Sequence, residues 1–162
     1  MDKQVRSRVS LLNPVHFLAF GFGSGLAAKM PGTFGTLAAL PLVVLLSYYA
    51  SFDVYLIVTI LISIVGIWIC GKTAEDMGVH DDSSIVWDEV AGMLITMIAV
   101  PLSWQTVLVG FALFRFFDIL KPWPISYLDK HVHAGFGIMI DDVMAGLFAL
   151  GCLHLGLTMG WF

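Results

Sequence analysis

Long apolar runs, separated by short polar stretches, restrict the fold of this chain more than any other feature of its sequence. Residues 54–70 contain no charged side chain, and hydrophobic residues make up 59% of the sequence against 12% for charged ones. A soluble domain carries roughly 25% charged residues. Since the mean hydropathy is also high, at +0.90, the sequence predicts an all-α, polytopic membrane protein built as a helical bundle.

The apolar runs indicate about four to five membrane spans within a single integral membrane domain covering residues 1–162. The runs are residues 36–50, 54–70, 85–101, 102–117 and 138–160. Several are shorter than the roughly 20 residues that a full crossing needs, so we expect them to tilt or to be partly buried in protein. Residues 1–10 are predicted to form a solvated basic tail. Residues 14–35 are rich in glycine and interrupted by Pro31, which indicates a re-entrant or interfacial segment.

The charged residues indicate which end of the bundle is polar. In the predicted order of spans, the N-terminal tail and the loops 71–84 and 118–137 lie on one side of the membrane. All eight Lys and Arg residues fall on that side or at span ends facing it, and so do all of the twelve carboxylates except Asp53. By the positive-inside rule this side is cytoplasmic. We therefore expect a polar site on the cytoplasmic surface of the bundle.

Doubled carboxylates occur in two of the predicted spans. Asp88 and Glu89 precede one apolar run, Asp141 and Asp142 begin the last one, and Asp118 ends another. Carboxylates that converge from three helices repel one another unless a cation lies between them, and Mg²⁺ prefers oxygen ligands of this kind. The alternative is that acidic residues favour helix starts, which does not account for Asp118. These carboxylates are therefore predicted to bind Mg²⁺.

A glycine-rich stretch is a candidate anion site close to the carboxylates. Exposed backbone N–H groups and threonine hydroxyls can form an anion nest, but the same small residues also allow helices to pack closely, and the spacing does not separate the two. The candidate phosphate-binding residues of this stretch are Ser24, Gly25, Gly32, Thr33, Gly35 and Thr36. Lys121 is placed to meet a phosphate at the level of the lipid headgroups, and the alternative is that it is an ordinary juxtamembrane basic residue. His80 and His133 are candidates for a general acid or a substrate contact.

The sequence disfavours several other classes of protein. There is no basic patch, so we expect no nucleic-acid partner. Cys70 and Cys152 lie far apart in apolar runs and indicate neither a disulfide framework nor cysteine-based chemistry. A small ion-coupled membrane carrier would also hold carboxylates in a helical bundle, although near the bilayer midplane, and it is the alternative function. The oligomeric state is not indicated.

Four motifs in a fixed order carry a resemblance to a known family. They are GFGSGL followed by PGTFGT, TAEDMGVHDDSSIVWDEVAGM, FRFFDILKPWPI, and Asp129 followed by HVHAGFGIMIDDVMAG, spread over residues 13–146. Together they resemble phosphatidylglycerophosphatase A, a family of Mg²⁺-dependent lipid phosphatases of the bacterial inner membrane. The resemblance implies hydrolysis of a membrane phospholipid, phosphatidylglycerophosphate, to phosphatidylglycerol and phosphate at the cytoplasmic face.

The resemblance also implies which residues form the site. The acidic residues of the family fall on Asp81, Asp88, Glu89, Asp118, Asp129, Asp141 and Asp142, and its histidines fall on His80 and His133. Its Lys-Pro-Trp-Pro motif falls on residues 121–124, so Lys121 and Asp129 join the residues expected to bind the substrate. The residues expected to take part in catalysis are Asp81, Asp88, Glu89, Asp118, His80 and His133. Whether water or a carboxylate attacks the phosphorus is left open.

Overall fold

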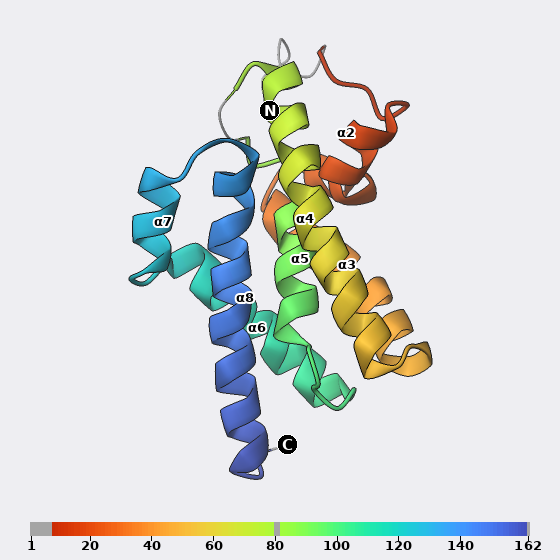
Figure 1. Cartoon of the computed structure of the whole chain (residues 1–162), viewed down its shortest axis with the longest axis vertical. Coiled ribbons are helices and arrows are strands. Elements are labelled where there is room, and N and C mark those ends of the chain that lie inside the picture. Colours follow the sequence, from red (N-terminus) through yellow and green to blue (C-terminus); the bar gives the residue numbers. More distant parts are fainter. Residues whose placement is uncertain (1–7, 80–81, 162) are drawn as a thin grey trace.

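The computed structural model describes residues 8–79 and 82–161 as a bundle of helices without strands (Figure 1). Two short elements, α2 (Pro14–Ala19) and η1 (Gly21–Leu26), precede the long helices. The helices that follow are α3 (Pro31–Tyr49), α4 (Phe52–Met77), α5 (Trp87–Thr96), α6 (Trp104–Leu120), α7 (Ile125–His131) and α8 (Ala134–Thr158). The predicted all-α bundle is confirmed.

Three of the described helices, α3, α4 and α8, are long and apolar enough to cross a membrane. α6 has 17 residues and α5 only ten, so these two are the short runs that the sequence predicted, and the number of spans roughly agrees with the expectation. Along α4, the side chains of Ile57, Leu61, Ile64 and Trp68 are exposed at helical spacing. A continuous apolar stripe of this kind suits a helix that faces lipid.

α5 is short and is enclosed by other helices. Every residue of α5 except Asp88 is buried, and the helix packs against α3, α4, α6 and α8. Glycines allow α8 to approach closely: a Cβ atom added at Gly146 would lie only 2.6 Å from the carbonyl oxygen of Gly92. A helix enclosed by other helices does not have to match the thickness of the bilayer. The first turn of α5 lies within the bundle, because Trp87, Glu89 and Val90 are buried.

Five helices bring their polar ends to the same end of the bundle. α3, α5 and α8 begin there and α4 and α6 end there, which is the upper half of the view in Figure 1. The turns after α3 and α5, and the C-terminus, lie at the opposite end. This arrangement gathers residues from distant parts of the sequence in one place.

The N-terminal break in the helices lies earlier than the sequence indicated. Pro31 does not interrupt a helix, because it occupies the first turn of α3, where its missing N–H costs no hydrogen bond. Gly32 and Gly35 also belong to this regular helix. The irregular backbone lies upstream, at residues 27–30, where Met30 adopts a left-handed conformation with φ 53°, and within η1, where Phe22 and Gly23 have φ of 60° and 95°. Residues 14–26 are otherwise helical, so the irregular backbone occupies less of the segment than residues 14–35.

The polar loops expected at residues 71–84 and 118–137 are also shorter, because helices extend into them. α4 continues to Met77, and on its last turns Lys72 pairs with Glu75 at 3.5 Å and with Asp76 at 2.6 Å. Pairs at these spacings support a helix. The second loop contains the end of α6, the whole of α7 and the start of α8.

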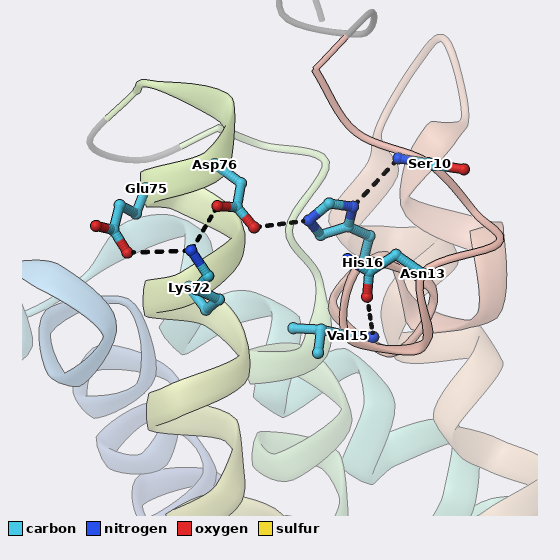
Figure 2. A network of polar contacts seen from close by, with 7 residues as sticks. All are labelled: Ser10, Asn13, Val15, His16, Lys72, Glu75 and Asp76. Atoms are coloured by element: carbon cyan, nitrogen blue, oxygen red, sulfur yellow. Dashed lines mark hydrogen bonds and ion pairs between the residues drawn. The ribbon is translucent and has the colours of Figure 1, made fainter.

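A polar network fastens the N-terminal segment to the end of α4 (Figure 2). The backbone N–H of Ser10 donates to Nδ1 of His16 at 3.1 Å, so Nε2 carries the hydrogen that it donates to Asp76 at 3.0 Å. Lys72 donates to the other oxygen of Asp76. His16 is almost fully buried, and the side chain of Asn13 caps α2 by accepting from the N–H of Val15. This network holds α2 against α4.

Replacement of His16 by alanine is expected to lower the stability of the folded protein. The change leaves a cavity where the buried imidazole ring stood and removes its hydrogen bonds to Ser10 and Asp76. The measurement is the melting temperature of the purified protein in detergent. His131→Ala is the control, since His131 is exposed. Equal melting temperatures for the two variants would show that the network does not stabilise the fold.

Candidate active site

A cavity of about 300 Å³ opens at the polar end of the bundle. Residues from α3, α5, α6, α7 and α8 and from the adjoining loops line it. Its charged lining residues are Asp88, Glu89, Arg115, Asp118, Lys121, Asp129, Asp141 and Asp142. The structure thus brings together all five carboxylates that were predicted to bind metal, along with Lys121 and Asp129. In the part of the chain that the structure describes, six carboxylates face two cations there, so this lining has an excess of negative charge.

Three of these carboxylates form a compact group. Asp88, Glu89 and Asp142 each offer an oxygen atom, and these atoms lie within 4.8 Å of one another. Oε2 of Glu89 and Oδ2 of Asp142 are buried and have no hydrogen-bond partner among the described residues. Buried carboxylate oxygens without donors are costly. A small cation that prefers oxygen ligands fits this donor set.

Asp118 lies apart from that group and pairs with a cation. Its carboxylate forms a close ion pair with Arg115, three residues earlier on α6. Nη1 of Arg115 also lies 3.7 Å from Oε1 of Glu89. All three side chains are largely buried. Arg115 therefore links Asp118, at the end of α6, to the first turn of α5.

Lys121 holds two carboxylates at the other side of the cavity. Its ammonium group donates to Asp129 and to Asp141, each at 2.5 Å. Partial burial would lower the pKa of Lys121, but the hydrogen bonds to the two carboxylates outweigh this effect and raise the pKa above its usual range. Lys121 directly follows α6 as its C-cap residue, so the end of this helix sets the position of the cation. The ammonium group therefore stays charged at neutral pH.

The structure separates most of the glycine-rich candidates from the cavity. Among them only Gly32 lines it. The Ser24 hydroxyl donates to the carbonyl of Gly21 at 2.8 Å, and the buried Thr36 hydroxyl donates to that of Gly32 at 2.9 Å. Gly35 lies where a Cβ atom would be 2.6 Å from Cβ of Val86, and Gly25 packs against the backbone of Ser84. Close packing accounts for these residues, as one of the two interpretations of the stretch proposed.

Three further candidates lie elsewhere. Thr33 is partly buried in the first turn of α3 and does not line the cavity. His133 is exposed at the N-terminus of α8 and does not line it either. His80 and Asp81 lie outside the described residues. Their proposed roles in catalysis stay predictions.

Arg115 also lines the cavity and was not among the residues predicted to form the site. It lies three residues before Asp118 on the same face of α6, and the two side chains form an ion pair. The sequence did not indicate that this face would turn inward and meet Glu89. The contact depends on the position of α6 relative to α5, which no local pattern specifies.

Comparisons with known proteins agree with the motifs. The family model described as phosphatidylglycerophosphatase A matches residues 17–157. The chain is 55% identical over 144 residues to phosphatidylglycerophosphatase A of Haemophilus influenzae, a match that covers 88% of each chain. It is 49% identical over 150 residues to the Escherichia coli protein of that name, covering 92% of this chain and 87% of the relative.

A more distant relative carries a different name. A Bacteroides thetaiotaomicron protein whose name refers to a phosphatidylinositol-3-phosphatase is 37% identical over 136 residues, covering 80% of this chain and 84% of the relative. No solved structure matches the chain.

Removal of one charge from the carboxylate group is expected to stabilise the protein when divalent cations are absent. Asp142→Asn relieves repulsion with Asp88 and Glu89, and a gain of about 1 kcal/mol would raise the melting temperature by roughly 2–4 °C for a protein of this size. The measurement is thermal unfolding in detergent with excess EDTA. Asp53→Asn, at the opposite end of the bundle, is the control. A lower melting temperature for Asp142→Asn would contradict the charge repulsion inferred here.

Proposed function

This chain belongs to the phosphatidylglycerophosphatase A family, and from that premise we propose that it hydrolyses the phosphomonoester of phosphatidylglycerophosphate to give phosphatidylglycerol and inorganic phosphate. The observation that carries the proposal is the cavity itself. Six carboxylates and two cations line it, at the polar end of a bundle with three apolar helices. Because this lining carries an excess of negative charge, it suits a phosphate ester that binds together with a divalent cation.

Mg²⁺ is the cofactor that the donor set suits best. Asp88, Glu89 and Asp142 would hold it, since their oxygens are close together and two of them have no other partner among the described residues. Asp118 and Asp141 stay candidate ligands, although each is paired with a cation here. A bound Mg²⁺ supplies positive charge for the phosphate oxygens and lowers the pKa of a coordinated water.

The cavity residues supply the remaining chemistry. Lys121 stands at the cavity wall and would pair with phosphate oxygens, which stabilises the charge that develops in the transition state. In the hydrolysis, a water oxygen forms the new bond to phosphorus, the bond from phosphorus to the glycerol oxygen breaks, and that oxygen takes up a proton and leaves as an alcohol.

Water is the favoured nucleophile over a carboxylate. Asp118 is engaged by Arg115, and Asp129 and Asp141 are engaged by Lys121. The other three carboxylates form the group suited to a cation. Among the described residues, each carboxylate that lines the cavity thus has a role other than attack on phosphorus.

The position of the cavity suits a substrate that stays in the membrane. The acyl chains would lie beside the apolar helices while the headgroup enters at the polar end. Because the basic residues lie on that side, we propose the inner membrane of a bacterium with the cavity at the cytoplasmic face. The alternative of an ion-coupled carrier has no support from the relatives, and the carboxylates line a cavity at the polar end of the bundle.

Phosphate release from phosphatidylglycerophosphate in mixed micelles tests this proposal. We expect the unaltered protein to release phosphate with Mg²⁺ and to lose this activity in excess EDTA. The rate of release by Asp88→Asn should be lower by at least about 100-fold, because even the loss of a residue that only supports a metal ligand costs up to about 100-fold. Asp53→Asn is the matched control and should keep full activity. Phosphatidylinositol 3-phosphate as a second substrate distinguishes the two headgroups named among the relatives.

Two results would contradict the proposal. Release that survives both EDTA and Asp88→Asn would remove the metal from the reaction. A folded protein that releases no phosphate from phosphatidylglycerophosphate would refute the assigned substrate.

A further inference from the structure

The cavity contains a second cation, Arg115, to which the proposed reaction assigns no part. Its side chain is 15% exposed and lines the cavity from α6. A guanidinium group has five N–H donors in a rigid plane. Asp118 and Glu89 both lie closest to Nη1, while Nε is buried without a hydrogen-bond partner among the described residues. The side chain therefore has donor capacity that its ion pairs do not use.

The two cations of the cavity differ in how many of their N–H donors already contact carboxylates. Lys121 has one point charge and donates to two carboxylates at 2.5 Å. Arg115 makes one close pair and one long contact at 3.7 Å. Lys121 thus has one N–H left, whereas Arg115 has several, held in one plane, to donate to an incoming anion.

The first turn of α3 leaves room for the guanidinium group only because residue 32 is a glycine. A Cβ atom at this position would lie 3.0 Å from Nη1 and 3.2 Å from Nη2 of Arg115, and it would overlap Oε1 of Glu89. Gly32 lines the same cavity. Backbone of α3, the Glu89 carboxylate and the guanidinium group thus meet at one point of the cavity wall, which restricts the orientation of the guanidinium plane.

We propose that Arg115 binds the phosphate group of the substrate directly, as a specific pair of donors rather than as a diffuse positive charge. This inference rests on the proposed phosphatase function. Arginine pairs with phosphate through two parallel N–H donors, a geometry that lysine cannot reproduce. A phosphate between Arg115 and the carboxylate group would be close to both the guanidinium donors and a cation held by Asp88, Glu89 and Asp142.

The simpler alternative is that Arg115 only neutralises Asp118 and Glu89. The two roles differ in what lysine can replace. A counter-charge is retained by Arg115→Lys, whereas paired donation to phosphate is not. Arg115→Lys is therefore the informative substitution, and Arg115→Gln, which also removes the charge, is the second one.

The test measures phosphate binding and turnover in the same set of variants. Inorganic phosphate binding to the Mg²⁺-loaded protein is measured by calorimetry, and KM, kcat and inhibition by inorganic phosphate are measured with phosphatidylglycerophosphate in mixed micelles. Lys29→Gln is the control, because Lys29 is exposed, lies two residues before Pro31 and does not line the cavity.

For Arg115→Lys we expect the dissociation constant of phosphate, its inhibition constant and KM to rise together by about ten- to hundredfold, the range for a lost charge-assisted hydrogen bond. The melting temperature should stay close to that of the unaltered protein. Arg115→Gln should bind phosphate more weakly still, and Lys29→Gln should behave like the unaltered protein.

Wild-type phosphate affinity and KM in Arg115→Lys would overturn the inference and leave Arg115 as a counter-ion, and this variant decides the question even if Arg115→Gln does not fold. Failure of the proposed function gives a different result. If the unaltered protein binds inorganic phosphate through Arg115 but releases none from the lipid, the assigned substrate is wrong and the phosphate contact stands.

Discussion

Mutual repulsion among the cavity carboxylates is the constraint on which the rest of the structure depends. Asp88, Glu89 and Asp142 lie within one small volume, and the two cations of the cavity are already paired with Asp118, Asp129 and Asp141. A buried carboxylate without a cation or a donor opposes folding. The bundle must therefore supply enough packing energy to hold this group together, and a divalent cation would relieve the strain that remains.

Close contacts between the helices supply that packing energy. α8 contacts α4, α5, α6 and α7, and small residues mark its nearest approaches. A Cβ atom at Gly71 on α4 would lie 3.2 Å from Cα of Gly135, and one at Gly146 would meet Gly92 on α5. In lipid, where apolar surface gives little reason for helices to associate, such contacts are a main source of stability. The packing that sets the distance between α5 and α8 also sets the distance between Glu89 and Asp142.

The sequence predicted the class of fold and the carboxylates that meet in the cavity better than the bounds of the helices or the pairing of those carboxylates. Apolar runs placed the helices, and doubled carboxylates identified Asp88, Glu89, Asp141 and Asp142 without structural information, because both signals are local. The ends of α4 and α6 were missed, since ion pairs such as Lys72 with Asp76 extend a helix past its apolar run. The division of the carboxylates among Arg115, Lys121 and the compact group depends on how α5, α6 and α8 lie relative to one another. That arrangement is tertiary, and no spacing along the chain encodes it.

The most direct test of this account is the binding of Mn²⁺, a spectroscopically visible substitute for Mg²⁺, followed by electron paramagnetic resonance without any substrate. If the compact carboxylate group holds the cation, Glu89→Gln should weaken Mn²⁺ binding by at least about tenfold, and Asp118→Asn, which removes a carboxylate already paired with Arg115, should weaken it less. Equal Mn²⁺ affinity in Glu89→Gln and the unaltered protein would contradict the account, because the cation would then bind elsewhere.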